Sequence, residues 1–418
     1  MANKSNTIVG LDIGTTTITV VVGEILSDGK VNIVGVGRSP SRGLRKGVVI
    51  NIEATVESIS KAIEQAETMA GIEISSVIAA ISGSHIKGIN SNGIVGIKGK
   101  EVSSIDVEKV IDAAKAVAIP LDREVLHVLP QEFIIDDQDG IREPLGISGV
   151  RLEVRVHIVT GAVASAQNIV KCANRCGLSV RDIVLASLAS GAAVISPEEQ
   201  ELGVCLVDIG GGTTDITVFH GGGVKHTSVL AVGGTHITND IAAGLRTPIA
   251  AAESIKCEYA SAIGSSAAHG ALSHQSTLFD ETIEVPSTGG RPPRVISRTV
   301  LSDIVEPRMN EIFTLVQREL MRAGCEEFLT SGIVLTGGTA NLQGIEQLAE
   351  NIFDLPVRVG APIGISGVVD LVKGPEYSTA VGLALQGAKE QSLSSFSTNR
   401  SFTGKVFQRV SNWFAEHF

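Results

Sequence analysis

The chain has 418 residues, of which 43% are apolar and only 3% aromatic, and its formal net charge is −11. An acidic chain without a basic run argues against nucleic acid as the main partner. The length suggests two or three domains, whose cores must consist of Val, Ile, Leu and Ala. The start shows no signal-peptide pattern and no apolar run approaches about twenty residues, so we expect a cytoplasmic body that does not span a membrane.

Strands are predicted first along the chain. Ile8–Ile25 and Lys30–Gly37 have the composition of three short strands, and the polar loop Arg38–Lys46 follows them. Apolar residues recur on one helical face over Asn51–Gly71, and the terminal glycine is typical of a helix end. Another strand is expected at Ile74–Ser82.

The sequence pattern changes between about Ser84 and Thr160, where turns and short strands surround one helix near Ser104–Ala118. This pattern predicts a small α+β domain inserted into the first half. Its acidic loop Asp136–Gly140 lacks the spacing of an EF-hand, so a solvated turn is favoured over a calcium site.

A strand at Arg151–Val159 closes the insertion, with Arg151, Glu153, Arg155 and His157 predicted to face outward. Helix, strand and helix are then expected at Ala162–Cys176, Ser179–Leu185 and Ser187–Ile195. Ser196–Gln200 contains a proline and is predicted to be a linker between two halves of the chain.

The second half opens with Leu206–Val218, which reads LVDIGGGTTDITV. Asp208 ends an apolar run, three glycines follow, and a second β-prone run begins after Asp215, which predicts a hairpin with a glycine turn. Such a turn can present backbone N–H groups to an anion, and the two aspartates could hold a hydrated Mg²⁺. A plain hairpin with a solvated turn is the alternative.

A similar segment occurs near the N-terminus, where Val9–Val22 reads VGLDIGTTTITVVV. Asp12–Val20 repeats Asp208–Val218 if two glycines of the second turn are left out. A repeat over this separation suggests two similar halves that face each other, with a ligand between the two hairpins.

Glycine pairs recur in the second half. Gly233 and Gly234 precede a predicted helix, and Gly337 and Gly338 follow a predicted strand, at the kind of strand end where a nucleoside lies in an open α/β sheet. A helix cap is the alternative for the second pair. The predicted strands are Glu281–Pro286, Pro293–Ser297, Gly332–Thr336 and Val357–Gly360, and the predicted helices are Ile237–Gly244, Ile249–Ala260, Ser302–Ala323 and Ser378–Leu385.

The last residues have the pattern of a detached membrane anchor. Gly387–Gly404 is rich in serine and predicts a flexible linker. As a helix of about 21 Å, Lys405–Phe418 is too short to cross a bilayer, and its aromatic face predicts a position in the membrane interface. Docking on the protein's own core is the alternative. The residues expected at the membrane are Val406, Phe407, Val410, Trp413, Phe414 and Phe418, with Lys405 and Arg409 beside anionic lipid.

The order of these motifs resembles the superfamily of actin, sugar kinases and heat-shock-chaperone ATPases, in which two ribonuclease-H-like lobes clamp Mg-ATP. Gly43–Gly71, Leu129–Gly149, Arg151–Thr160 and Gly289–Arg308 are similar to the FtsA family of bacterial cell-division proteins, and the likeness covers essentially the whole chain. The implied fold is α/β and actin-like, with two lobes around a nucleotide cleft, an inserted α+β subdomain and a C-terminal amphipathic helix.

The resemblance also implies which residues hold ATP and Mg²⁺. Asp12 and Asp208 would lie by the metal. The phosphates would contact Gly14, Thr15, Thr16, Gly210, Gly211, Gly212 and Thr213, and the adenosine would contact Gly234, Glu253, Lys256, Gly337 and Gly338. A surface ion pair is the alternative for Glu253 and Lys256.

By the same resemblance, the protein polymerises and tethers the FtsZ ring to the cytoplasmic face of the bacterial inner membrane, as a peripheral protein at the division site. The FtsZ C-terminal peptide would dock at about 229–299, and the insertion would serve filament contacts and the recruitment of later division proteins. The expected division is 1–83 with 161–198 and 366–386 as the first core subdomain, 84–160 as the insertion, 199–228 with 300–365 as the second core subdomain, 229–299 as its small subdomain, 387–404 as the linker and 405–418 as the membrane helix.

One departure bears on mechanism. Relatives that hydrolyse ATP well tend to carry Glu or Gln on the connecting helix, whereas Ala186–Gly191 contains neither. We therefore assign no catalytic residue and expect ATP to act as a conformational ligand with slow turnover or none. A small-molecule kinase of the same superfamily is the alternative. A chaperone would need a large peptide-binding domain, for which too few residues remain after Gln386.

Overall fold

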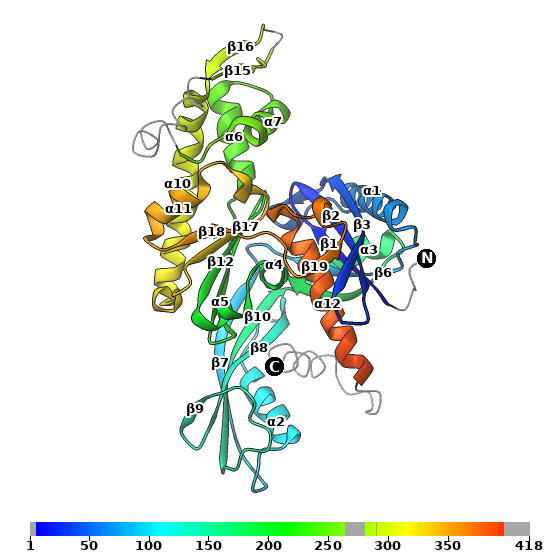
Figure 1. The fold of residues 1–418 in the computed structure, drawn as a ribbon, viewed down its shortest axis with the longest axis vertical. Helices are drawn as coiled ribbons and strands as arrows, with labels where there is room; N and C mark the ends of the chain where they lie inside the picture. Colours follow the sequence, from blue (N-terminus) through cyan, green and yellow to red (C-terminus); the bar gives the residue numbers. More distant parts are fainter. Residues whose placement is uncertain (1–5, 264–280, 290, 397–418) are drawn as a thin grey trace.

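The structure is a computed structural model that describes residues 6–263, 281–289 and 291–396. Two lobes lie side by side, each built on one mixed β-sheet, and a smaller sheet extends away from them (Figure 1). Buried apolar side chains form three clusters, centred on the two lobes and the smaller sheet. Leu206 and Val334 of the second lobe belong to the cluster of the first, so the two lobes share part of one core.

The sheet of the first lobe has the strand order β11-β6-β1-β2-β3-β19. β1 pairs with β2 antiparallel and with β6 parallel. The central strands are runs of Val and Ile that are buried on both faces, as expected for a sheet covered by helices. The strands are β1 (Thr7–Ile13), β2 (Thr17–Ile25), β3 (Val31–Pro40), β6 (Ser76–Ile81), β11 (Ser179–Leu185) and β19 (Ile365–Gly367).

The sheet of the second lobe repeats this arrangement with the order β18-β17-β12-β13-β14. β12 pairs with β13 antiparallel and with β17 parallel, as β1 does with β2 and β6. The internal repeat therefore comprises five strands in each lobe and extends well beyond the two hairpins. The strands are β12 (Val204–Ile209), β13 (Thr214–His220), β14 (Gly223–Leu230), β17 (Ile333–Thr336) and β18 (Val357–Val359).

The turns of the two hairpins are equal in length, which corrects the predicted alignment. The N–H of Gly14 donates to the carbonyl of Thr17 at 3.1 Å, and the N–H of Gly210 donates to that of Thr213 at 2.9 Å. The prediction that the second turn has two extra glycines is therefore wrong. The equivalent pairs are Gly14 and Gly210, Thr15 and Gly211, Thr16 and Gly212, and Thr17 and Thr213.

Helices cover both sheets, and their ends follow local capping rules. The Asn51 side chain accepts the N–H of Ala54 at the start of α1 (Ile52–Ala70), and Gly71 ends this helix with a left-handed φ of 67°. The other helices of the lobes are α3 (Val163–Arg175), α4 (Ala186–Val194), α5 (Pro197–Leu202), α6 (Gly234–Leu245), α7 (Ile249–Tyr259), α10 (Arg298–Ala323), α11 (Ile345–Phe353) and α12 (Ser378–Phe396). No helix among the described residues is long and apolar enough to cross a membrane.

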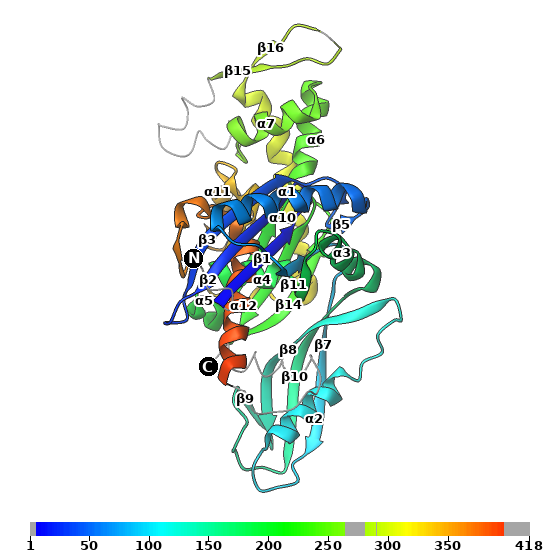
Figure 2. The ribbon, with the colours of Figure 1, turned by 90° about the vertical axis from the view of Figure 1, so that its right-hand side faces the viewer.

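The predicted insertion is a separate α+β unit. Its sheet has the order β7-β10-β8-β9, and α2 (Ser104–Lys115) packs on one face of it (Figure 2). The strands are β7 (Lys87–Gly96), β8 (Arg123–Ile135), β9 (Gln138–Ile141) and β10 (Arg151–Ala162). Two small hairpins complete the fold, β4 (Leu44–Arg45) with β5 (Val48–Val49) and β15 (Thr282–Val285) with β16 (Arg294–Ser297).

The acidic loop of the insertion is a turn with a structural role. Asp136 accepts the backbone N–H groups of Val150 and Arg151, and Asp137 forms an ion pair with the Arg151 side chain. Both aspartates have positive φ, which short polar side chains tolerate. The carboxylates are thus engaged by the chain itself.

Three expectations about local structure are wrong. His157 does not face solvent, because its ring is buried between Asn90 and Thr227, where β10 meets β14 of the second lobe. Ser196–Gln200 is not a linker, since Ser196 and Glu199 form a capping box that starts α5. The segment predicted as a linker from Gly387 begins inside α12, which continues to Phe396.

Close packing of α4 against α12 yields a prediction on stability. A Cβ added at Gly382 would collide with the carbonyl oxygen of Ala189, so Gly382→Ala should lower the free energy of unfolding by about 1–3 kcal/mol. Urea denaturation measures this change. Gly96→Ala is the matched control, because no atom lies within 4 Å of its added Cβ. Equal effects of the two substitutions would contradict the proposed packing constraint.

Candidate functional site

A cavity of about 1480 Å³ lies between the two lobes. Its walls come from the β1–β2 turn, the β12–β13 turn, the β4–β5 hairpin, α6, α7 and the residues after β17. A cavity of this size is large enough for a nucleotide with its metal and water.

The two hairpin turns contact each other directly across this cleft. A Cβ added at Gly211 would lie 2.7 Å from the Thr16 hydroxyl oxygen, and one added at Gly212 would lie 2.5 Å from that of Thr15. Thr15 and Thr16 therefore occupy the space that glycine leaves free in the opposite turn. Both glycines are required by this approach of two backbones.

The turns also leave hydrogen-bond donors free. In the part of the chain that the structure describes, the backbone N–H groups of Thr15, Thr16, Gly211 and Gly212 take part in no hydrogen bond. The carbonyls of the second turn are engaged instead, since Gly234 N–H donates to Gly210 at 2.9 Å and Thr235 N–H to Gly211 at 2.8 Å. Unpaired N–H groups beside a cleft fit an anionic group such as a phosphate.

Three carboxylates lie at the base of the cleft, with Asp208 and Asp215 buried and Asp12 half-buried. Burial and the negative charges of Asp208 and Asp215 raise the pKa of Asp12 to about 7. Burial raises the pKa of Asp208 to about 6, although hydrogen bonds from Ser190 and Thr379 lower it, and burial with the charge of Asp208 raises that of Asp215 to about 7. The cluster thus favours a cation.

These carboxylates fit a hydrated Mg²⁺ better than an enclosed metal. Among the described residues no group of three His, Cys, Asp or Glu side chains is arranged to hold a metal ion. Mg²⁺ binds through one or two carboxylates and takes its other oxygens from water and phosphate. Asp12 and Asp208 at the turns are suited to that role.

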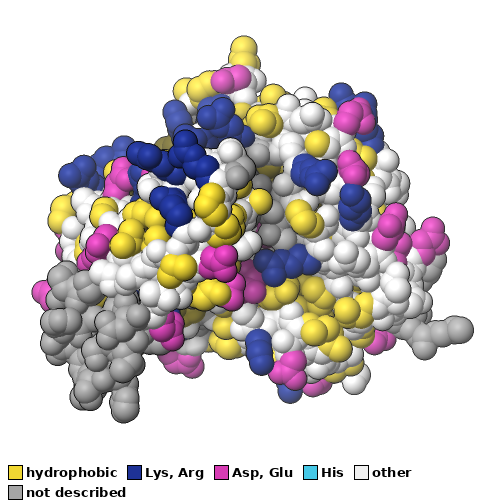
Figure 3. All heavy atoms as spheres, turned by 90° about the horizontal axis from the view of Figure 1, so that it is seen from above, with side chains coloured by type: hydrophobic (Ala, Val, Ile, Leu, Met, Phe, Trp, Pro, Cys, Tyr) yellow, Lys and Arg dark blue, Asp and Glu magenta, His cyan; other side chains and the backbone are white. Residues whose placement is uncertain are grey.

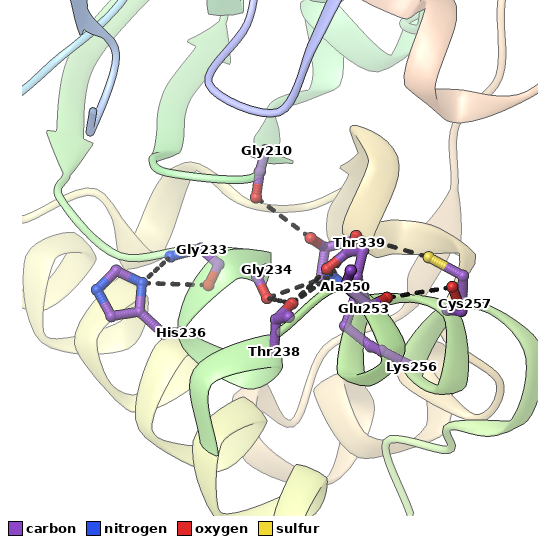
Figure 4. Close-up of polar contacts among 11 residues, drawn as sticks. Gly210, Gly233, Gly234, His236, Thr238, Ala250, Glu253, Lys256, Cys257 and Thr339 are labelled. Atoms are coloured by element: carbon purple, nitrogen blue, oxygen red, sulfur yellow. Dashed lines mark hydrogen bonds and ion pairs between the residues drawn. The ribbon is translucent and has the colours of Figure 1, made fainter. Parts of the chain in front are cut away.

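The predicted pair Glu253 and Lys256 is not an ordinary surface ion pair. Lys256 is buried and donates to Glu253 at 2.8 Å, to Thr238 at 3.0 Å and to the carbonyl of Gly234 at 3.3 Å (Figure 4). Burial would raise the pKa of Glu253, but the Lys256 ammonium and the hydrogen bonds that Glu253 accepts from Lys256, Thr238 and Cys257 lower it overall. Both side chains line the cleft, whereas Gly234 lies behind its wall and positions Lys256.

Gly337 and Gly338 line the cleft directly after β17. Gly337 has a φ of +84°, and a Cβ there would meet the Asp208 carboxylate and lie 2.7 Å from the carbonyl of Ile209. Glycine is therefore needed where the chain passes the buried aspartate. Next to the pair, Asn341 donates to Glu376 at 3.0 Å.

Comparison with known proteins assigns the family. The chain is 51% identical over 418 residues to the cell division protein FtsA of Pseudomonas aeruginosa, with 98% of each chain covered. It is 43% identical over 427 residues to FtsA of Escherichia coli K12, covering 100% of this chain and 99% of that protein. The chain belongs to the FtsA family.

Family models agree with this assignment. The model for cell division protein FtsA matches residues 205–382, and the model for the SHS2 domain inserted in FtsA matches residues 83–160. The predicted family and the predicted insertion are both confirmed.

Solved structures confirm the actin-like fold of this FtsA-family chain. The type IV pilus PilM–PilN complex has a TM-score of 0.64 at 17% identity, covering 91% of this chain and 98% of that chain. MreB5 of Spiroplasma citri bound to ADP has a TM-score of 0.56 at 14% identity, covering 95% and 100%. The MamK double helical filament has a TM-score of 0.50 at 13% identity, covering 92% and 98%.

Several cleft residues were not predicted from the sequence. Ser82 at the end of β6 donates to Asp215 at 2.6 Å, and Thr379 on α12 donates to Asp208 at 3.3 Å. The segment between β3 and α1 contributes Arg42 and Lys46 to the wall. The four basic residues of the loop Arg38–Lys46 were the only signal in the sequence, and hydroxyl residues carried none.

The connecting helix α4 offers no carboxylate or amide in this FtsA-family chain. Its buried hydroxyls are engaged within the fold, since Ser187 accepts from Thr217 at 2.7 Å and Ser190 bonds to Asp208. Only Ala186 of this helix lines the cleft. The predicted membrane residues between Lys405 and Phe418 lie outside the described residues.

The buried carboxylates yield a prediction on pH. Because the folded pKa of Asp12 lies near 7, above its unfolded value, its contribution to stability is present below about pH 4 and is lost as the pH rises through 7. In metal-free and nucleotide-free protein, Asp12→Asn should therefore raise the free energy of unfolding at pH 8 by about 2 kcal/mol or more and change it less at pH 5.5. Denaturant titrations at the two pH values measure the difference.

The matched control is Asp28→Asn, in an exposed turn beside Lys30. It should change stability little at either pH. An equal effect of Asp12→Asn at pH 5.5 and pH 8 would show that charge burial is not the cause.

Proposed function

We propose that this FtsA-family chain binds Mg-ATP between its lobes, polymerises, and tethers the FtsZ ring to the cytoplasmic face of the bacterial inner membrane at the division site. Nucleotide binding is supported by one observation above all: the two turns contact each other directly, and their free backbone N–H groups lie beside the same cleft. ADP is bound by the similar MreB5 structure, and a filament is formed by the similar MamK structure.

Specific residues would hold the nucleotide. The turns Gly14–Thr16 and Gly210–Thr213 would donate N–H groups to the phosphates, and Asp12 and Asp208 would hold the hydrated Mg²⁺. Bound Mg²⁺ would neutralise part of the phosphate charge. Glu253, Lys256, Gly337 and Gly338 would line the adenosine side, with Gly234 supporting Lys256.

ATP would act in this site mainly as a conformational ligand. The turns would orient the phosphates, but α4 supplies no group to accept a proton from water, so the rate gain of about 10²–10⁴-fold that a general base on this helix would provide is lacking. A ligand that contacts both turns binds best when the lobes are held together, and its binding energy therefore favours one angle between them.

Nucleotide binding is tested by Gly212→Val, which would place side-chain atoms against Thr15 and the Lys46 backbone. We expect Mg-ATP affinity, measured by calorimetry, to fall by about 100-fold or more because the collision displaces the turns that would hold the phosphates. Gly96→Val is the matched control, because an added side chain at this position meets no neighbouring atom.

ATP turnover of the unaltered protein should stay far below the roughly 1–100 s⁻¹ of kinases, and a rate in that range would favour the kinase alternative.

Membrane attachment is proposed from the sequence of Lys405–Phe418. One short amphipathic helix with Lys405 and Arg409 should bind anionic lipid reversibly, at about 1 kcal/mol for each basic residue. A filament presents many such helices at once, and avidity would make the attachment stable. Polymerisation and membrane binding would therefore depend on each other.

A basic surface supports docking of the FtsZ C-terminal peptide on 229–299. Arg246, Arg291 and Arg294 are exposed there. Figure 3, which views the molecule from the end with the β15–β16 hairpin, shows Lys and Arg side chains gathered over this part of the surface. A peptide that ends in a carboxylate would be attracted to such a surface.

The inserted subdomain at 84–160 would form filament contacts and recruit later division proteins.

Liposome flotation tests the tether. The full chain should float with anionic vesicles and carry an FtsZ C-terminal peptide with it, whereas a chain ending at Gly404 should stay at the bottom and still bind Mg-ATP. Trp413→Glu in the full chain is the second variant and should reduce flotation strongly. Flotation of the truncated chain would refute the anchor assignment.

A further inference from the structure

The loop between β4 and β5 lies against both phosphate turns. The N–H of Gly47 donates to the Thr15 hydroxyl at 3.0 Å. A Cβ added at Gly212 would lie 3.0 Å from the Cα of Lys46, so the lysine backbone lies over the turn of the second lobe. Lys46 is thereby placed where the two turns meet.

The backbone of this loop is held in an uncommon conformation. Lys46 has a φ of +52° and Gly47 a φ of +76°. The N–H groups of Ile50 and Asn51 both donate to Gly43, which closes the loop onto the start of α1. A lysine keeps left-handed backbone only where its surroundings enforce it, and such positions concentrate at functional sites.

The charges around the cleft leave few cations for an anionic ligand. The basic side chains that line it are Arg38, Arg42, Arg45, Lys46 and Lys256. Lys256 is paired with Glu253, and Arg38 lies 3.9 Å from Glu376. Within the described residues Arg42, Arg45 and Lys46 form no ion pair, and of these three Lys46 adjoins the turns.

The geometry points to Lys46 as the residue that binds the terminal phosphate of a nucleoside triphosphate. This inference rests on the proposed nucleotide site and adds to it a residue that distinguishes a triphosphate from a diphosphate. The turns would donate backbone N–H groups to the phosphates, and the flexible lysine stem can place an ammonium on the outermost one.

The test compares Mg-ATP and Mg-ADP affinity by calorimetry in the full chain. Lys46→Asn removes the charge and keeps a residue that tolerates left-handed backbone. It should weaken Mg-ATP binding about tenfold or more, as for the loss of a hydrogen bond to a charged group, and leave Mg-ADP binding within about twofold. Lys46→Arg should restore most of the preference for ATP.

Lys61→Asn is the matched control, since it removes one positive charge from the exposed face of α1 and should alter neither affinity. If Lys46→Asn lowers the melting temperature markedly, Lys46→Gly replaces it, because glycine suits the backbone of this position. Equal loss for ATP and ADP, no loss for either, or the same loss in Lys61→Asn would overturn the inference. If the unaltered chain binds neither nucleotide, the proposed nucleotide function fails, and this inference fails with it.

Discussion

The architecture depends on the close approach of two backbone turns. The Thr15 and Thr16 side chains of one turn occupy the space next to Gly212 and Gly211 of the other. The turns can approach this closely only because the second turn has no side chains at these two positions. The contact fixes the two central hairpins relative to each other, because β1 and β12 run directly into the turns. The cavity lies beside this contact, lined by residues of both turns.

An electrostatic consequence follows from the same approach. Bringing the lobes together gathers Asp12, Asp208 and Asp215 in one cluster, where burial raises all three pKa values and the neighbouring negative charges raise those of Asp12 and Asp215 further. Such a cluster is unfavourable when empty and ionised, and a bound cation relieves it. A metal-nucleotide ligand would therefore stabilise the arrangement in which the lobes are in contact.

The inserted subdomain is joined to both lobes. Its chain connections run from β6 to β7 and from β10 to α3 in the first lobe. Its sheet also contacts β14 of the second lobe, where His157 bonds to Thr227 and Gln131 donates to the carbonyl of Val224 at 2.8 Å. Burial lowers the pKa of His157 to about 3, so its ring is neutral in this contact. A change in the angle between the lobes would be transmitted to the insertion through these bonds.

Local sequence patterns were sufficient to predict most helices and strands of this protein, because helix caps and hydrophobic periodicity depend on residues that are close together in the chain. Asn51 and Gly71 bound α1, the two hairpins are visible as repeated motifs, and the insertion stands out by its turns. Other features depend on contacts between residues that are far apart in the sequence, and only the tertiary structure shows them. The equal length of the turns required strand register, the burial of His157 required a neighbouring lobe, and the place of Lys46 required the second turn beside it. The raised pKa values have the same origin, since desolvation and charge repulsion arise only when Asp12 on β1 is packed against the β12–β13 hairpin that carries Asp208 and Asp215.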